Sequence, residues 1–382
     1  MTYVGIDIEQ FVRDPYGSGI QRVLQYLAKE WPVDRVQADF VVPMVDGYGL
    51  LTPAQAFDLL SIPFTPQDPG ADLRQLVGGA LDGMEILRVR PGDLLAIYDA
   101  WLLPEVSYLP SVLERFELFA RCVPTVMVGY DTLPMSEPAN YRFKPGSSAW
   151  VSEYFRHLAT ADAVVCISSY ARDSILGRLR RDPALPIGVA HPGGDHMPVR
   201  LAQAPARPVF TRLGTLESRK RPVEILRAFQ EAVAHHGVEA DLLFIGGPSA
   251  SDETINAAVR AAVEAGEPVR WVRGASDEEV HDLVNRSSVF LSIGTEGYGI
   301  PVLEAIRLGT PVLFDGIQPA GDLMDGRGAR RVPAMAHDDL VRMFVDYAAA
   351  GALDSLRSEA AGADVPTWVD FTNAVAEACR TR

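Results

Sequence analysis

The feature that most constrains the fold is an alternation of short apolar runs with amphipathic stretches, and this alternation starts afresh halfway along the chain. In the first half, the apolar runs lack strict polar alternation, as strands buried on both faces do. Helical stretches such as Ile20–Glu30 and Ser169–Leu179 fall between these runs. This β-α-β-α order predicts a parallel sheet covered by helices on both faces. The predicted strands are Tyr3–Ile8, Asp39–Val42, Leu94–Tyr98, Val123–Gly129, Ala163–Ile167 and Pro186–Ala190.

The second half repeats the pattern with clearer helices. The stretch Pro222–His235 places its apolar residues on one stripe, as an amphipathic helix does. The stretch Ser276–Asn285 opens with a serine cap followed by three acidic residues, which suit the positive start of a helix. We therefore predict a second Rossmann-like unit. Its predicted strands are Pro208–Leu213, Asp241–Ile245, Val269–Val272, Val289–Ile293 and Pro311–Phe314.

The length of 382 residues also favours two domains, because one hydrophobic core seldom serves so long a chain. We place the first domain at 1–200 and the second at 201–365, joined near Pro192–Arg207. A C-terminal helix at 366–382 is a candidate for packing back on the first domain. The Pro/Asp-rich stretch Pro63–Arg74 has little periodicity and is expected to be a long loop.

Composition narrows the class of function. The formal net charge of −15 disfavours a nucleic-acid partner, which normally needs a basic face. Three widely spaced cysteines form neither a disulfide framework nor a metal-ligand spacing, and they suit a reducing cytosol. No apolar run approaches the ~18 residues that span a bilayer. We expect a soluble, cytoplasmic protein without a transmembrane segment.

The strongest candidate site lies in the segment 292–312, where a predicted buried strand ends. Ligands of open parallel sheets bind at the carboxyl ends of the strands. Gly297 and Gly299 allow a tight turn there, and a helix is expected to start near Gly299–Pro301, with free amides that suit a diphosphate or a sugar hydroxyl. Glu296 precedes the turn and Glu304 lies about one helical turn further, so two carboxylates could bind hydroxyl groups. The alternative is that Glu296 caps the helix and Glu304 is solvated.

A second candidate segment is Leu213–Pro222, between the first strand and the first helix of the second domain. Arg219, Lys220 and Arg221 place three cations at a helix start, where the helix dipole disfavours positive charge. This local cost is expected where an anion binds, since arginine can contact phosphate oxygens bidentately and lysine acts as a point charge. A solvated basic turn is the alternative.

Together these segments resemble a known family. The pieces Gly214–Lys220, Phe244–Gly247 and Val272–Glu279, with the paired glutamates Glu296 and Glu304, are similar to the C-terminal half of the retaining GT-B glycosyltransferases of family four, the glycosyl transferases group one. Gly17–Val23 resembles the glycine loop of the bacterial mannosyl- and rhamnosyltransferase-like branch. The resemblance covers roughly Pro208–Asp325 well and the first domain at scattered points. It implies an α/β GT-B fold, with two Rossmann-like domains in tandem and an interdomain cleft.

The resemblance also implies roles for individual residues. Arg219 and Lys220 would hold the donor diphosphate, Glu304 the ribose hydroxyls and Glu296 the transferred sugar. Gly17 and Gly19 would let the backbone of the first domain approach the phosphates, although without the family an ordinary turn before a helix explains them. The backbone amides expected to assist at the sugar belong to Gly297, Tyr298, Gly299 and Ile300.

Two positions depart from the family pattern. Thr215 stands where many relatives carry an arginine, so one phosphate contact is missing there. Tyr130-Asp131 stands where relatives commonly have His-Asp. A tyrosine with an ordinary pKa of about 10 cannot replace neutral imidazole as a base at pH 7, but it can hydrogen-bond a sugar. Asp131 would orient the acceptor or bind a sugar hydroxyl, and the alternative is that Tyr130 merely packs at the edge of the sheet.

The expected function is transfer of a sugar from a nucleoside diphosphate, with retained configuration and front-face attack. We expect no metal and no other cofactor. The favoured donor is a GDP- or UDP-hexose, and the acceptor a small molecule or a glycan, in natural-product or polysaccharide biosynthesis. The alternatives are a catalytically inactive GT-B scaffold that binds a nucleotide or a partner, and a sugar-nucleotide epimerase or hydrolase. A nicotinamide dehydrogenase is disfavoured because no Gly-x-Gly-x-x-Gly follows the first strand.

Three further groups of polar residues carry weaker expectations. His191 and His196 do not have a recognised metal-ligand spacing, and a structural contact at the domain joint is expected. Asp7-Ile-Glu9 resembles the metal-binding acidic motif of the other main glycosyltransferase fold, but that fold does not explain the second half of the chain. The pair Asp322 and Asp325 is expected to be solvated.

Overall fold

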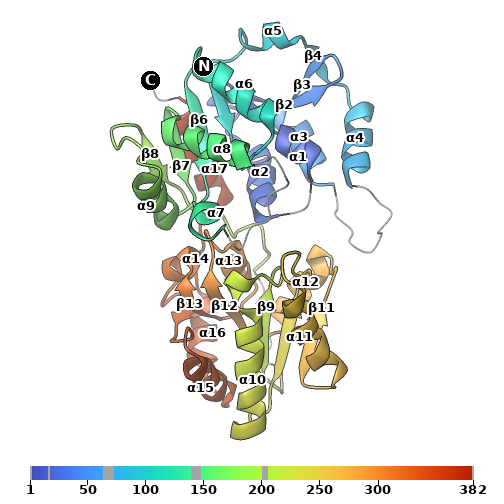
Figure 1. Cartoon of the computed structure of the whole chain (residues 1–382), viewed down its shortest axis with the longest axis vertical. Coiled ribbons are helices and arrows are strands. Elements are labelled where there is room, and N and C mark those ends of the chain that lie inside the picture. The colour runs from blue at the N-terminus through green and yellow to red at the C-terminus, as the bar shows by residue number, and fades with distance from the viewer. Residues whose placement is uncertain (1, 16–17, 63–72, 139–147, 200–204, 381–382) are drawn as a thin grey trace. The chain divides into compact units, whose positions relative to one another are not determined.

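The computed structural model describes residues 2–15, 18–62, 73–138, 148–199 and 205–380, and these form two compact units (Figure 1). The first unit contains the described residues up to 132, those of 148–192, and those from 367 onward. The second unit contains 133–138 and the described residues of 193–366. The stretch Pro63–Arg74 lies outside the described residues except at its last two positions.

The sheet of the first unit is parallel at its centre and antiparallel at one edge. Its strand order is β4-β3-β2-β1-β5-β6-β7-β8, and the β2–β3 and β3–β4 pairs are antiparallel. The prediction of a parallel sheet is therefore wrong at this edge. Only Val45 and Asp46 separate the paired residues Met44 and Gly47, whereas a parallel crossover needs a dozen or more residues. The strands are β1 (Thr2–Asp7), β2 (Val36–Met44), β3 (Gly47–Leu51), β4 (Leu87–Val89), β5 (Ala100–Leu103), β6 (Thr125–Gly129), β7 (Ala163–Cys166) and β8 (Ile187–Val189).

One predicted strand of the first unit is wrong. Leu94–Tyr98 forms the end of a short helix and a turn, and the strand β5 follows it at Ala100. Within this apolar run only Leu94 and Tyr98 are buried, four residues apart, which is a helical rather than an extended spacing. The backbone joins the sheet at Asp99, whose amide donates to the carbonyl of Tyr3 at 2.8 Å.

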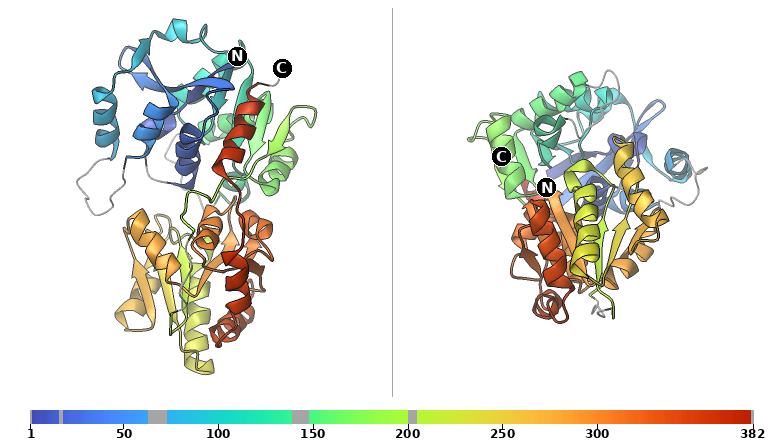
Figure 2. Two further views of the ribbon diagram at one scale, coloured as in Figure 1. Left: turned by 180° about the vertical axis from the view of Figure 1, so that it is seen from behind. Right: turned by 60° about the horizontal axis from the view of Figure 1, so that its bottom comes forward.

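The helices of the first unit include one from the far end of the chain. The helix α17 contacts β7 and α2, and the rings of Tyr26 and Trp368 stack with centroids 4.7 Å apart (Figure 2). The last described helix therefore completes the core of the first unit. The helices are α1 (Glu9–Arg13), α2 (Gly19–Lys29), α3 (Pro53–Leu60), α4 (Leu73–Gly83), α5 (Pro91–Leu94), α6 (Pro110–Ala120), α8 (Ser148–Thr160), α9 (Ser169–Arg178) and α17 (Trp368–Ala378).

The second unit contains a fully parallel sheet with the strand order β11-β10-β9-β12-β13-β14. Numbered from β9 as the first strand, this order is 3-2-1-4-5-6, the arrangement of a Rossmann fold. The five predicted strands are confirmed, and β12 and β13 extend further toward their carboxyl ends than predicted. The strands are β9 (Val209–Leu213), β10 (Asp241–Ile245), β11 (Val269–Val272), β12 (Val289–Thr295), β13 (Val312–Ile317) and β14 (Ala329–Arg331).

Helices pack around this sheet (Figure 1). The two predicted helices are confirmed, and Ser276 caps the second with a reciprocal bond from Glu279. Phe344 packs edge-on against Phe210 and Phe229, with ring centroids 4.9 and 5.2 Å apart, and thereby ties helices to the central strand. The helices are α7 (Leu133–Ser136), α10 (Pro222–His236), α11 (Glu253–Glu264), α12 (Asp277–Asn285), α13 (Ile300–Arg307), α14 (Pro319–Leu323), α15 (His337–Ala348) and α16 (Asp354–Ala361), with a 3-10 turn η2 (Ser218–Lys220).

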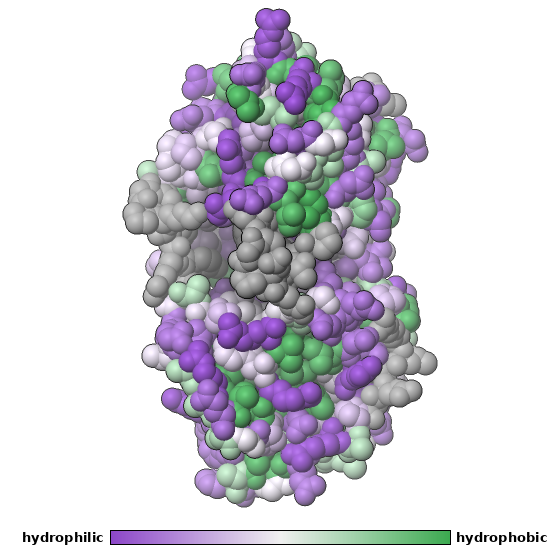
Figure 3. All heavy atoms as spheres, turned by 90° about the vertical axis from the view of Figure 1, so that its right-hand side faces the viewer, coloured by the Kyte–Doolittle hydropathy of each residue, from purple (hydrophilic) through white to green (hydrophobic). Residues whose placement is uncertain are grey.

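The surface is mostly hydrophilic on the face shown in Figure 3, with apolar side chains in small groups between charged ones. Among the helices in the described part of the chain, none combines the length and the apolar character that a bilayer span requires.

Candidate functional site

The strand order of the second unit fixes where a ligand can bind. The chain runs outward from β9 to β10 and β11, and then returns to the other side of β9 at β12. In open parallel sheets the crevice outside the carboxyl ends of two such strands is the usual ligand site. The segment 214–221 follows β9 and Glu296 follows β12, so both predicted motifs lie at this point.

The structure brings Arg219, Lys220 and Glu296 into direct contact. Arg219 Nη1 donates to Glu296 Oε2 at 2.7 Å, and Lys220 Nζ lies 3.1 Å from Glu296 Oε1. The three side chains are only 14 to 18% exposed. Both cations stand on the 3-10 turn η2, which presents consecutive residues to the end of β12.

A third cation joins this cluster and was missed from the sequence. Arg212 is 5% exposed, and its Nη2 lies 3.8 Å from Glu296 Oε1. Its Nε and Nη2 have no hydrogen-bond partner among the described residues. Burying a guanidinium with unsatisfied hydrogen-bond donors costs free energy unless a negative charge nearby offsets that cost. The available signal was an arginine inside the otherwise uncharged strand Val209–Leu213.

The electrostatics of the cluster keep Glu296 ionised. Burial alone would raise the pKa of Glu296, but the adjacent charges of Lys220, Arg219 and Arg212 outweigh it and hold the pKa at about 2. Burial, together with Arg219 and Arg212, lowers the pKa of Lys220 from its usual value. Glu217 also pairs with Arg219 at 2.6 Å. Three cations against two carboxylates leave one net positive charge, in a chain whose total is −15.

Two glycines make this arrangement possible. Gly294 has φ +109°, and a Cβ on it would lie 2.1 Å from the carbonyl oxygen of Arg219. Gly214 has φ +116°, and a Cβ there would lie 2.7 Å from Lys220 Nζ. Both positions need the left-handed backbone that glycine adopts without strain. The close approach of β12 to η2 therefore depends on Gly294.

The predicted helix start after Glu296 is confirmed. Gly299 has φ +102° and precedes α13, which begins at Ile300 with Pro301 in its first turn. Tyr298 is buried, and burial raises the pKa of its hydroxyl well above the usual value, so it stays neutral. The carbonyl of Tyr298 accepts from the amide of Ala320 at 2.9 Å, which ties the 297–300 turn to α14.

Glu304 lies in the first turns of α13 and is 7% exposed. The alternative that Glu304 is simply solvated is therefore wrong. His196 Nε2 lies 3.2 Å from Glu304 Oε1, and the side chain of His196 is equally buried. The expected structural contact of His196 thus falls on a predicted donor-site residue.

Arg221 does not join the cation cluster. Its backbone is left-handed, with φ +57°, and its Nη1 donates to the carbonyl of Ala334 at 3.0 Å. The three adjacent cations predicted at this helix start therefore divide into a pair that faces Glu296 and a third that bonds Ala334, in the segment after β14.

The candidate residues of the first unit lie at the carboxyl edge of its own sheet. Tyr130 follows β6, is 5% exposed, and donates from its hydroxyl to the carbonyl of Pro104 at 2.7 Å. Asp131 is half-buried. Gly19 is the exposed first residue of α2, and Ser18 caps this helix by accepting from the amide of Gln21. Gly17 lies outside the described residues.

Acidic residues at the same edge are engaged with other groups. Arg115 Nη2 lies 2.6 Å from Asp7 Oδ2 and 2.9 Å from Glu9 Oε2, so a guanidinium occupies the position between these carboxylates. Glu105, two residues after β5, is 2% exposed, and its Oε1 accepts from Gln21 Nε2 at 3.4 Å. Burial raises the pKa of Glu105 to about 8.

The Asp322 and Asp325 pair contacts Arg331. The Arg331 Nη2 pairs with Asp322 Oδ1 at 2.5 Å, and the backbone amide of Arg331 donates to Asp325 Oδ1 at 3.2 Å. Asp322 is 56% exposed. Asp322 and Asp325 are thus partly solvated, and both hold Arg331, the last residue of β14.

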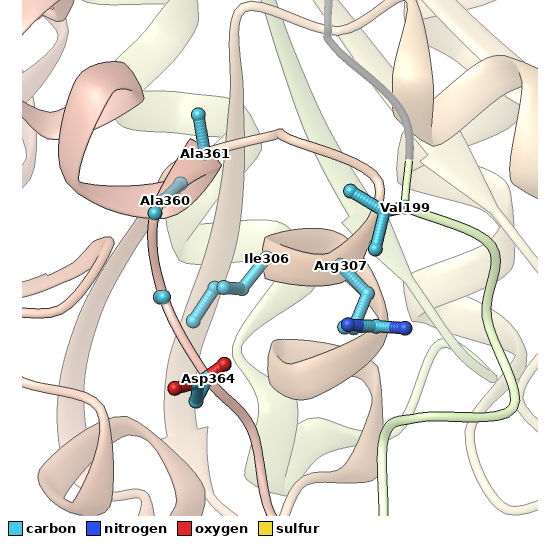
Figure 4. Close-up of a pocket in the computed structure, with 8 residues that line it drawn as sticks. Val199, Ile306, Arg307, Ala360, Ala361 and Asp364 are labelled. Atoms are coloured by element: carbon cyan, nitrogen blue, oxygen red, sulfur yellow. The ribbon is translucent and has the colours of Figure 1, made fainter.

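A small pocket lies at the other end of α13 (Figure 4). It measures about 140 Å³ and is lined by Ile306 and Arg307 of α13, Val199, and the segment 360–364. Sites for drug-sized ligands usually measure ~300 Å³ or more. The pocket is thus too small for a nucleotide, and it adjoins the last turn of α13 rather than the first.

The comparisons with known proteins agree with this geometry. Residues 198–323 match the family model described as glycosyl transferases group 1. This match covers 126 of the 382 residues, all within the second unit. The two α/β units have the fold of GT-B glycosyltransferases.

Individual relatives are more distant. The chain is 26% identical over 247 residues to one serotype-specific mannosyltransferase WbdA of Escherichia coli, covering 58% of the chain and 29% of the relative. A second WbdA is 25% identical over 342 residues, covering 81% of the chain and 38% of the relative. The chain therefore spans less than half the length of these relatives.

Solved structures share the fold. Anabaena HepE in complex with UDP matches with a TM-score of 0.65 and 15% identity, over 99% of both chains. A glycosyltransferase from Rickettsia africae matches with a TM-score of 0.59 and 13% identity, over 99% of this chain and 93% of the other. At these identities the likeness concerns the fold alone.

Proposed function

We propose that the chain transfers a sugar from a nucleoside diphosphate to a hydroxyl of a glycan or small-molecule acceptor, with retained anomeric configuration. A GDP- or UDP-hexose is the proposed donor. The names of the relatives support this choice, since WbdA is a mannosyltransferase and HepE was solved with UDP.

The observation that carries the proposal is the contact of Arg219 and Lys220 with Glu296 at the switch point of the second sheet. Cations this close to the carboxyl end of the central strands, beside the start of α13, form the charge pattern that a diphosphate needs. Arg212 adds a third positive charge beneath them. This charge compensates for the absence of the arginine that many relatives carry where this chain has Thr215.

Donor binding would redistribute these contacts. The diphosphate pairs with Arg219 and Lys220 in place of Glu296. Glu296, whose pKa of about 2 keeps it ionised, is then available to the hydroxyls of the transferred sugar. Glu304 receives the ribose hydroxyls. The amides of Gly297, Tyr298, Gly299 and Ile300 supply further donors.

The same charges would stabilise the transition state. Negative charge grows on the diphosphate as the sugar becomes cation-like, and fixed cations with helix amides stabilise this charge without reorganisation. These groups take the part that a metal plays elsewhere, so the proposed reaction is metal-independent. Retention then follows from front-face attack, in which the leaving phosphate accepts the proton of the acceptor hydroxyl.

The first unit would supply the acceptor side. Tyr130 and Asp131 follow β6 at the carboxyl edge of the first sheet, and Gly19 begins α2, which follows β1 and α1 along the chain. We propose that Asp131 orients the acceptor and that Tyr130, with its hydroxyl bonded to Pro104, shapes the sugar site.

The test is calorimetric binding of UDP, GDP and dTDP to the wild type and to Lys220→Ala. One nucleotide is expected to bind, and the variant to lose about tenfold or more in affinity, since a charged hydrogen bond contributes ~1.5–3 kcal/mol. Arg227→Ala is the control, because Arg227 is an exposed cation on the adjacent helix α10. Equal, negligible binding of all three nucleotides to the wild type would overturn the donor site.

A turnover assay separates the enzyme from the inactive scaffold. Release of free nucleotide from UDP- or GDP-hexose in the presence of a sugar acceptor is expected from the wild type and not from Glu296→Ala. A wild type that binds nucleotide but never releases it from the sugar would favour the scaffold.

A further inference from the structure

The segment 193–197, which leads from the first unit into the second, lies on the helix that carries Glu304. Gly194 packs on Leu303 of α13 so closely that a Cβ at Gly194 would lie 2.5 Å from the Leu303 Cβ. Two residues further, His196 Nε2 meets Glu304 Oε1 at 3.2 Å. Arg307 Nε donates to the carbonyl of Met197 at 3.4 Å. Three residues of the linker, Gly194, His196 and Met197, thus contact one side of α13.

The His196–Glu304 contact is nearly solvent-free. The side chains are 6 and 9% exposed. A hydrogen bond to a carboxylate in such surroundings is stronger than one in water, so losing it weakens the stabilisation of a buried acidic group. The bond therefore restrains the side-chain rotamer of Glu304 and also stabilises its carboxylate in the buried site.

We infer that His196 is a positioning residue for the nucleotide ribose: by bonding Oε1 of Glu304, it holds the carboxylate in the orientation that receives the ribose hydroxyls. The inference rests on the proposed function, in which Glu304 binds the ribose. It adds a second residue to the proposed ribose site, namely His196, which belongs to the linker between the two units.

The linker origin of His196 gives the inference a consequence. The backbone amide of Gly194 also donates to the carbonyl of Pro366, the last residue of the second unit, at 3.0 Å. The crossings after residue 192 and after residue 366 are therefore joined within two residues of His196. A nucleotide that engages Glu304 would thereby stiffen the segment about which the two units are connected.

The experiment compares ribonucleotide with deoxyribonucleotide binding. Calorimetry is done with UDP and 2′-deoxy-UDP, or with GDP and 2′-deoxy-GDP if the wild type prefers guanine, on the wild type, His196→Ala and His196→Gln. A glutamine can place an amide nitrogen near the position of Nε2. His235→Ala is the control, since His235 is exposed at the end of α10.

We expect His196→Ala to weaken ribonucleotide binding about tenfold and deoxyribonucleotide binding by less than about threefold, as for groups that orient a binding ligand. We expect His196→Gln to recover most of the affinity, and His235→Ala to match the wild type. In a cycle with Glu304→Gln, the His196→Ala effect should largely disappear.

Three outcomes would overturn the inference. Unchanged ribonucleotide affinity in His196→Ala removes the role altogether. An equal loss for both nucleotides, with no recovery in His196→Gln, shows that His196 only supports the fold of the linker. An effect of His196→Ala that persists in full in the Glu304→Gln background places its action elsewhere. If the wild type binds no nucleotide, the proposed function itself fails, which is a distinct result.

Discussion

The guanidinium of Arg219 donates to the carboxylate of Glu296 at 2.7 Å across 77 residues of sequence. The two residues follow neighbouring strands, and the parallel pairing of β9 with β12 brings them together. A buried ion pair of this kind is weak evidence for stability, because desolvation offsets much of the attraction. Its position at the ligand edge of the sheet makes function the better explanation.

Glu296→Gln tests whether the cations of this cluster bind the nucleotide while Glu296 acts on the transferred sugar. The substitution removes the negative charge shared by Arg219, Lys220 and Arg212, so the free protein should lose about 1–3 kcal/mol of unfolding free energy. Nucleotide binding should be retained or strengthened, because the diphosphate no longer competes with Glu296, while sugar transfer should fall about a hundredfold. Denaturation with and without UDP, and turnover, check these effects.

The control for that variant is Glu217→Gln. Glu217 pairs with Arg219 but is 37% exposed, so its loss should change turnover by less than about threefold. Similar turnover losses in the two variants would contradict a specific role of Glu296 at the sugar.

Arg212→Met tests the third cation. Methionine fills a comparable volume in β9 without charge, so the fold should persist, and nucleotide affinity should fall about tenfold. Arg270→Met is the matched control, since Arg270 is an exposed arginine on β11 in the same sheet. Undiminished nucleotide affinity in Arg212→Met would limit Arg212 to a structural role.

Gly294→Ala tests the close approach of β12 to η2. The new Cβ would strike the Arg219 carbonyl at 2.1 Å in a left-handed conformation, so the cost should exceed about 3 kcal/mol. Gly266→Ala is the control, because Gly266 has φ +72° but nothing within 4 Å of its Cβ position, and should cost only about 1–2 kcal/mol. Urea denaturation of both variants measures the difference. Equal costs would refute the steric account.

Glu105→Gln tests a pH dependence of stability. Burial raises the pKa of Glu105 to about 8, with Gln21, the Phe11 amide, Asp7 and Asp14 as its polar surroundings. Below the ordinary pKa of 4.5, folded and unfolded states are both protonated and nothing is lost. Between 4.5 and about 8, only the unfolded state ionises, so stability falls by about 1.4 kcal/mol per pH unit from this group.

The glutamine variant removes this loss. Its advantage over the wild type should therefore be small at pH 5 and grow up to pH 8, as followed by denaturation at several pH values. Glu114→Gln, an exposed position on α6, should show no such trend. A constant difference between Glu105→Gln and the wild type would contradict the assignment.

Sequence reasoning worked best where local signals were strong. Asp241–Ile245 and Val269–Val272 were predicted at their observed bounds, because each is a run of four or five residues flanked by Gly or Pro, a length and setting that favour a strand over a helix. It failed at Leu94–Tyr98, where an apolar run of similar composition buries only two side chains. The hairpin at Met44 and Gly47 was overlooked although Asp46-Gly47 is a strong hairpin signal.

The site was predicted only as far as its motifs reached. Arg219, Lys220 and Glu296 were assigned together through the resemblance, and the structure brings them into contact. Arg212 and His196 were not assigned, because their importance arises from tertiary proximity to Glu296 and Glu304. No local pattern distinguishes a strand arginine that faces a cluster from one that faces solvent.

The hydrogen bond from Gly194 to Pro366 closes the second unit at its base. Since α17 returns to the first unit, 193–366 is an insertion within that unit rather than an appendage behind it, and 133–138 is a second segment that belongs to the second unit. Both ends of 193–366 emerge at one point, so this segment can be exchanged without stretching the first unit, provided that 133–138 is exchanged with it. If the second unit binds the donor as proposed, recombination that alters nucleotide preference carries both segments, and two of its junctions lie beside His196.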